Sequence, residues 1–206
     1  MDEVGRGCLA GPVVAAAVLL PPEISTSKDP WLKQVTDSKE LEPEEREDLA
    51  PRIRAWAAGF AVAQCSAQEI DQHNILQASL IAMVRAVSAL PRVPGHVLVD
   101  GNMIPKGLTV PATAIIQGDL KCLSVACGSI LAKVWRDAHL TELEARHPGY
   151  GFASNKGYPT PVHFQALDTL GPCVEHRRSF GPVARSLNPT LGDVFDATLP
   201  ADPVRS

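Results

Sequence analysis

The sequence contains no run of about 18 apolar residues, the length that would suggest a membrane span, and we find no secretory signal in it. Its five cysteines are odd in number and widely spaced, and no two of them form a CxxC pair. A zinc site or a disulfide framework is therefore not expected. Together these absences favour a protein of the reducing cytoplasm.

The sequence also has no excess of positive charge, since its formal net charge is −4. No global basic field therefore indicates nucleic-acid binding. However, an enzyme that binds phosphates through metal ions needs clustered carboxylates, and these lower the net charge. Local basic patches can still contact phosphates, so the acidic balance leaves this class of function open.

The 206 residues, 45% of them hydrophobic and 20% charged, are enough for one sizeable core. Short apolar runs rich in valine are typical of buried strands, and longer periodic segments are typical of helices. We expect strands over 11–20, 59–65, 96–100 and 112–117, and helices over 41–56, 66–90, 123–146 and 160–170. This order predicts one α/β domain over 1–183, followed by a disordered tail over 184–206.

Local signals refine these elements. Ser66 and Glu69 have the spacing of a capping box, which predicts the start of the second helix. Pro51 lies inside the first predicted helix and is expected to kink or interrupt it. Residues 22–36 are predicted to form a polar loop.

Several acidic residues lie near predicted strand ends. Asp2 and Glu3 are adjacent, and Asp100 and Asp119 each follow a short apolar run. Each of these acids could instead lie in a turn or cap a helix, and Asp137, within the predicted helix over 123–146, could lie on a solvated helix face. Adjacent carboxylates on a strand also point to opposite faces. Carboxylates gathered at strand ends would suit Mg²⁺, and two such ions about 4 Å apart can promote phosphodiester cleavage.

A series of short motifs resembles those of the ribonuclease HII family, in family order from residue 2 to about 183. The motifs are DEVGRG at 2–7, DSK at 37–39, NIL at 74–76, DG at 100–101, GD at 118–119, SILAKV at 129–134 with RD at 136–137, YGF at 150–152, KGYPT at 156–160 and HRRSF at 176–180. Each is weak alone, but together they are specific. The resemblance implies a ribonuclease H-like fold, a central mixed β-sheet flanked by helices, with a helical C-terminal part.

The resemblance further implies an endonuclease that cleaves the RNA strand of RNA/DNA hybrids. It implies cleavage 5′ of single ribonucleotides embedded in duplex DNA, by two-metal-ion hydrolysis with Mg²⁺ or Mn²⁺ that leaves 5′-phosphomonoesters. Such an enzyme removes ribonucleotides and RNA primers from DNA. We expect a cytoplasmic monomer with these nucleic acids as partners, whereas the sequence indicates neither protein partners nor the preferred ion.

Carried over by position, the resemblance implies roles for particular residues. The metal-binding catalytic carboxylates would be Asp2, Glu3, Asp100 and Asp119, and Asp137 would support them or be structural. The backbone around Gly5, Arg6 and Gly7 would contact the ribose 2′-hydroxyl, which distinguishes RNA from DNA, and Tyr158 would stack on the sugar at the RNA–DNA junction. Candidate phosphate contacts, for which surface solubility is the alternative, are Arg6, Lys39, Lys133, Lys156, Arg177 and Arg178.

Two alternatives stay open. One is a ribonuclease HIII-like enzyme, but that type carries an extra N-terminal substrate-binding domain for which we find no room. The other is a nucleic-acid-binding module that has lost catalysis. The presence of all four inferred acidic ligands argues against such loss. One feature favours it, because the family normally has several residues before its acidic pair and here only Met1 precedes Asp2.

The start of the sequence generates a prediction. If Met1 is the natural start, its amino group, with an ordinary pKa of about 7.7–8.0, competes with Mg²⁺ for the carboxylates, and the first strand lacks its leading residues. Our hypothesis is that the natural start lies upstream, or that this is a shortened form with impaired metal binding. Adding about six strand-forming residues should raise metal affinity, thermal stability and cleavage rate. Equal values for the short and extended forms in all three measurements would contradict the hypothesis.

Overall fold

The computed structural model describes residues 1–26 and 29–188, and the five strands of these residues form two hydrogen-bonded groups, which together make the sheet layer. Three of them pair antiparallel in the order β1-β2-β3, namely β1 (Asp2–Val4), β2 (Val13–Leu19) and β3 (Gly59–Cys65). The other two pair in parallel, namely β4 (Val97–Asp100) and β5 (Ala112–Ile115).

Met1 connects the two groups of strands. Its amino nitrogen donates to the carbonyl oxygen of Leu98 at 2.7 Å, and the amide of Asp100 donates to the carbonyl oxygen of Met1 at 3.1 Å. β4 therefore lies beside β1, and the order across the layer is β3-β2-β1-β4-β5. The predicted α/β fold with a mixed sheet is confirmed.

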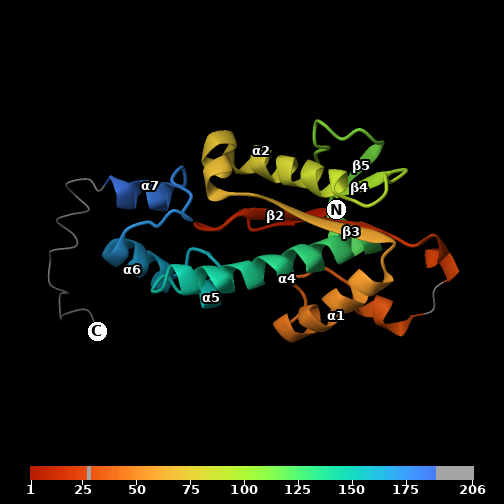
Figure 1. The fold of residues 1–206 in the computed structure, drawn as a ribbon, viewed down its shortest axis with the longest axis horizontal. Coiled ribbons are helices and arrows are strands. Elements are labelled where there is room, and N and C mark those ends of the chain that lie inside the picture. The colour runs from red at the N-terminus through yellow and green to blue at the C-terminus, as the bar shows by residue number, and fades with distance from the viewer. Residues whose placement is uncertain (27–28, 189–206) are drawn as a thin grey trace.

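Helices cover both faces of this layer. α2 (Ala67–Ser88) lies on one face, and α4 (Leu123–Arg146) and α1 (Pro43–Trp56) lie on the other (Figure 1). The remaining helices are shorter: η1 (Pro22–Thr26), η2 (Pro30–Gln34), α3 (Gly118–Lys121), α5 (Phe152–Asn155), α6 (Pro161–Leu170) and α7 (Gly181–Leu187). Among the described residues, no helix is both long and apolar enough to span a bilayer.

The apolar run of β2 is continuous because both of its faces are buried. Val13, Ala15 and Ala17 belong to the core cluster on the α2 side, and the residues between them belong to the cluster on the α4 side. Small residues bring α4 very close to the strand. A Cβ added to Gly128 would lie only 2.9 Å from the carbonyl oxygen of Ala16.

The structure differs from the sequence-based elements in several places. α1 continues through Pro51 without the expected interruption, because Leu49 and Ile53 bury one face of the helix and stabilise it. The predicted polar loop over 22–36 contains the two 3-10 helices. α2 begins with the predicted capping box of Ser66 but has a non-helical residue, Asn74, with φ 63° and ψ 163°.

The C-terminal boundary also differs. α7 extends to Leu187, past the expected start of the tail at residue 184, so this part of the expected tail is helical. Val183 of α7 is completely buried beside Leu9 and Leu167, which explains why the helix forms there. The rest of the expected tail, 189–206, lies outside the described residues.

Two glycines provide a test of how closely the backbone at Gly157 approaches the backbone at Ala10. Gly157 has φ +80° and a Cβ there would lie 2.6 Å from the carbonyl oxygen of Ala10, whereas Gly107 has φ +108° and only Val84 within 4 Å, at 3.9 Å. Alanine at either position carries positive-φ strain of about 1–2 kcal/mol. Only Gly157→Ala must also displace backbone, at a further cost of about 1–3 kcal/mol. The free energy of unfolding in urea should fall further for Gly157→Ala, and equal losses would contradict the approach.

Candidate active site

Three carboxylates meet where β1 and β4 lie side by side. Asp2 and Glu3 come from β1 and Asp100 from the end of β4. One carboxylate oxygen from each lies within 4.8 Å of the others. Although adjacent residues of a strand ordinarily point to opposite faces, both acids of this short strand contribute an oxygen here.

Burial makes the negative charge of this group costly. The pKa of Asp2 is raised to about 7 by burial and then by the charge of Glu3. Burial also raises the pKa of Glu3, and the charge of Arg6 opposes that rise. In addition, Glu3 Oε2 is buried and has no hydrogen-bond partner among the described residues. A buried, unpartnered oxygen within a group of carboxylates fits a hard divalent cation, which prefers oxygen ligands.

Hydrogen bonds hold these carboxylates in place. The amide of Glu3 donates to Asp2 Oδ1 at 2.7 Å, and the amide of Gly118 donates to Asp100 Oδ1 at 2.7 Å. Arg6 Nη1 lies 3.2 Å from Glu3 Oε1. Glu3 and Asp100 are thus each oriented through one oxygen, which leaves the second oxygen of each for a ligand.

Asp119 borders this group. It lies in the first turn of α3 and is 8% exposed, and its Oδ1 accepts from the amide of Leu120 at 3.0 Å. Its pKa is raised first by burial and then by the charges of Asp37 and Asp100. Asp119 therefore lies close enough to Asp100 for the charge of Asp100 to raise its pKa. It lies outside the set of three oxygens within 4.8 Å.

The loop over 37–39 also faces the acids. Burial lowers the pKa of Lys39, but the carboxylates of Asp37, Asp2, Asp119 and Asp100 together raise it above its usual value. Asp37 was not among the predicted site residues, although its motif had been noted. The signal that could have found it is an acidic residue two positions before Lys39, which was predicted to contact phosphate.

A pair of serines supports Asp2 from behind. The Ser129 hydroxyl of α4 hydrogen-bonds the Asp2 carboxyl and lowers its pKa, in opposition to burial. Ser129 Oγ lies 2.8 Å from Ser38 Oγ, and Arg46 of α1 donates to the Ser38 carbonyl at 2.8 Å. The sequence analysis did not predict this support, for which the available signal is a serine, Ser129, in the middle of the apolar half of the helix.

Two buried arginines shape the glycine-rich loop after β1. Arg177 donates to the carbonyl oxygens of Gly5 at 2.7 Å, Arg6 at 2.9 Å and Gly11 at 3.0 Å. Gly5 has φ +92°, and a Cβ there would lie 2.2 Å from Nε of Arg136. The prediction that Arg177 contacts phosphate is wrong, because its side chain is completely buried and its donors are used within the protein.

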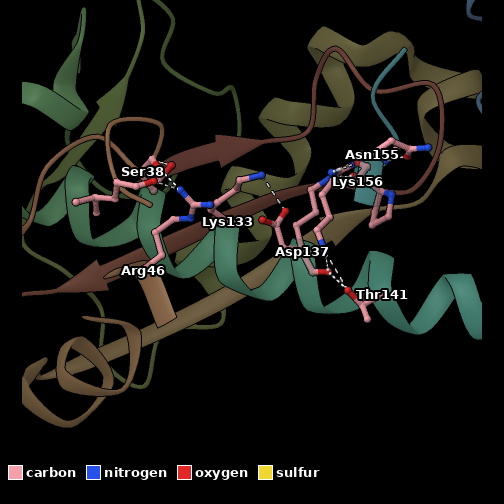
Figure 2. A network of polar contacts seen from close by, with 12 residues as sticks. Ser38, Arg46, Lys133, Asp137, Thr141, Asn155 and Lys156 are labelled. Atoms are coloured by element: carbon pink, nitrogen blue, oxygen red, sulfur yellow. Dashed lines mark hydrogen bonds and ion pairs between the residues drawn. The ribbon is translucent and has the colours of Figure 1, made fainter. Parts of the chain in front are cut away.

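The other predicted phosphate contacts divide into lysines that are bound by neighbouring side chains and residues that are more exposed. Lys133 Nζ lies 2.9 Å from Asp137 Oδ1, and Lys156 Nζ donates to Thr141 Oγ1 at 3.0 Å (Figure 2). Asp137 thus orients Lys133 and lies outside the set of three carboxylates. The more exposed candidates are Arg6, Lys39 and Arg178.

Tyr158 lies beside Lys133, one of these basic residues. Its side chain is half-buried, with 39% of the residue exposed, and Lys133 Nζ lies 5.9 Å from the centre of its ring. Its hydroxyl hydrogen-bonds the buried thiol of Cys8, and burial raises the pKa of this phenol. The contact with Cys8 thus holds the ring in place, and the Lys133 ammonium group lies over it.

Comparison with known proteins gives consistent similarities. A model of the family described as Ribonuclease HII matches residues 1–183. A ribonuclease HII from Nitrosococcus oceani is 52% identical over 187 residues, which cover 91% of this chain and 90% of that protein. A ribonuclease HII from Anaeromyxobacter sp. is 50% identical over 197 residues, 95% of this chain, and the match spans 60% of that protein. The crystal structure of ribonuclease H2 from Pyrococcus horikoshii has a TM-score of 0.74 at 26% identity, covering 90% of this chain and 94% of that one.

The raised pKa of Asp2 predicts how stability depends on pH when metal is removed. Between the unfolded value of 3.8 and the folded value of about 7, the folded protein holds a proton that the unfolded chain has lost. The contribution of Asp2 to stability therefore decreases as pH rises through this window. In chelator, Asp2→Asn should raise the melting temperature more at pH 8 than at pH 5.

The matched control is Asp48→Asn, which removes an exposed carboxylate on α1. It should not raise the melting temperature at either pH. If the melting temperatures of Asp2→Asn and the unsubstituted protein differ by the same amount at pH 5 and pH 8, the buried charge at Asp2 is contradicted.

Proposed function

Because this chain belongs to the ribonuclease HII family, we propose that it cleaves 5′ of a ribonucleotide embedded in duplex DNA. Members of this family are ribonucleases H, hydrolases that cut the RNA strand of RNA/DNA hybrids. The observation that carries the proposal is the set of three carboxylate oxygens, from Asp2, Glu3 and Asp100, within 4.8 Å of one another. Removal of ribonucleotides and RNA primers from DNA is the corresponding cellular role.

The family depends on divalent metal ions, and we assign Mg²⁺ or Mn²⁺ to this site. Asp2, Glu3 and Asp100 would hold the metal, and Asp119 at the border would complete the ligand set. When bound, two such ions would activate a water and stabilise charge on the leaving oxygen. The high pKa of Asp2 and the unpartnered Glu3 Oε2 support this assignment, since a cation would offset both.

The loop over 5–7 is suited to recognise the ribose 2′-hydroxyl. Its carbonyl groups at Gly5 and Arg6 are held by Arg177, so the backbone is preorganised before substrate arrives. Nothing lies within 4 Å of the position that a Cβ at Gly7 would occupy, which leaves the backbone there open to a ligand. We assign the contact that distinguishes RNA from DNA to this backbone.

Tyr158 would stack on the sugar at the RNA–DNA junction, with Lys133 beside its ring. The exposed cations, Arg6, Lys39 and Arg178, and the tethered Lys156 would contact phosphates on either side. Because Asp137 holds Lys133 at 2.9 Å, its role would be to orient that ammonium group. These contacts position the phosphodiester against the carboxylates, and such positioning supplies a large part of catalysis.

The central prediction concerns Asp100→Asn. The amide keeps the Oδ1 acceptor for Gly118 but removes the charge that would hold the metal. Cleavage of duplex DNA with a single ribonucleotide, measured with and without Mg²⁺, should fall at least about 100-fold. Substrate binding in a gel-shift assay should be unchanged or tighter, because repulsion of phosphates is reduced.

The control is Asp168→Asn on α6, an exposed acidic residue that should leave cleavage unchanged. Retained turnover of Asp100→Asn at saturating Mg²⁺ would show that Asp100 is not a ligand. If the unsubstituted protein binds this duplex but never cuts it, the alternative of a binding module without catalysis is correct instead.

A further inference from the structure

Two buried histidines that the proposed chemistry does not use lie next to the backbone of Tyr158. His163 on α6 is completely buried and His176 is 1% exposed, and their Nε2 atoms are 3.0 Å apart. Aromatic rings enclose the pair. Phe152 meets His163 edge-on with centroids 5.6 Å apart, and Tyr150 lies 4.9 Å from His176.

The two ends of this pair determine where its protons are. The amide of Cys173 donates to His176 Nδ1 at 3.0 Å, so that nitrogen is an acceptor. A neutral His176 must then carry its proton on Nε2 and donate to Nε2 of His163. His163 in turn carries its proton on Nδ1 and donates to the carbonyl oxygen of Tyr158 at 2.9 Å.

The chain of donors requires both rings to be neutral. Burial lowers the pKa of both histidines, and that of His176 reaches about 4 by burial and then by the charge of His163. The charge of His147 contributes to the same shift of the His176 pKa. The other titratable groups beside the pair, Tyr150 and Cys173, have pKa values raised by burial and are uncharged at neutral pH. An added proton would turn two N–H groups toward each other.

The segment that carries Tyr158 needs such support because its backbone is strained. Lys156 has φ 50° although it is not glycine, and Gly157 follows with φ 80°. Residues in this region persist only where surrounding contacts hold them. The Tyr158 carbonyl accepts from His163 and from the amide of Thr160 at 2.9 Å. His163 is therefore the side-chain contact that ties the backbone of Tyr158 to α6.

We propose that His163 is a positioning residue, which together with His176 fixes the backbone of Tyr158 and hence the orientation of its ring toward the substrate. This inference rests on the proposed function, in which Tyr158 stacks on the sugar at the RNA–DNA junction. The neutral pair acts at one backbone carbonyl group, that of Tyr158. It touches neither substrate nor metal.

The test uses pairs of substitutions in the full chain, with kcat/KM measured on duplex DNA containing one ribonucleotide. Tyr158→Ala alone should lower kcat/KM by about 100-fold, since misplacement of a substrate costs that much. His163→Phe keeps a buried ring but removes both nitrogens, and should lower kcat/KM by roughly 10-fold or more. In the Tyr158→Ala background, His163→Phe should cause no further loss, because no ring is left to position.

Two controls separate positioning from general stability. His163→Asn keeps a donor where Nδ1 lay, so it should retain most of the activity that His163→Phe loses. Leu167→Ala truncates another buried residue of α6, and its effect should be the same with Tyr158 present or absent. Melting temperatures are measured for every variant, so that a loss of folded protein is not read as a loss of rate.

The outcomes are distinct. Equal losses from His163→Phe in both backgrounds, or no loss when Tyr158 is present, would overturn the positioning role. An unaffected Tyr158→Ala variant would remove Tyr158 from the proposed site as well, which identifies a failure of the function rather than of the pair alone. If His163→Phe does not fold, imidazole ¹⁵N NMR of the unsubstituted protein decides, since a proton on His163 Nε2 or on His176 Nδ1 would refute the donor chain.

Discussion

The arrangement of the site depends on two completely buried guanidinium groups, Arg136 and Arg177. Between them they donate to six backbone carbonyls, five of which belong to the loop between β1 and β2. Burial lowers the pKa of Arg177 to about 10, and the charge of Arg136 contributes to the shift. Buried cations persist only when their donors are satisfied, so the loop must follow the path that these carbonyls define. Gly5 is needed on that path because Arg136 occupies the space of a side chain.

The same constraint places the acidic group. The loop leads directly out of β1, so fixing its carbonyls also fixes the strand that carries Asp2 and Glu3. The sheet order then brings Asp100 alongside, and Ser129 of α4 supports Asp2 from the helix layer. Folding thus concentrates negative charge in a buried position, at a cost shown by the raised pKa of Asp2. A divalent cation would offset that cost, which links metal binding to stability as well as to catalysis.

The groups that we propose to face the substrate are held by the same kind of contact. Arg136 also donates to the carbonyl of Lys156, and the amide of Leu9 donates to the carbonyl of Gly157 at 2.8 Å. The loop after β1 and the segment of Tyr158 are therefore one connected unit. The pair of His163 and His176 ties this unit to α6 from behind. The acids and the residues that we propose to position the nucleic acid consequently depend on a single network of buried donors and backbone acceptors.

The sequence by itself predicted the α/β class and most helices and strands, because apolar periodicity is a local property of the chain. Its short motifs, through the family resemblance, named Asp2, Glu3 and Asp100, which the structure brings together. It also named Tyr158 and the loop over 5–7. It could not assign Arg177, which in sequence looks like any surface arginine, because its acceptors lie 166 to 172 residues away. Ser129, Asp37 and the histidine pair were missed for the same reason. What a long polar side chain binds is decided only when distant segments meet, since burial turns each unpaired donor into a cost that the tertiary structure must satisfy.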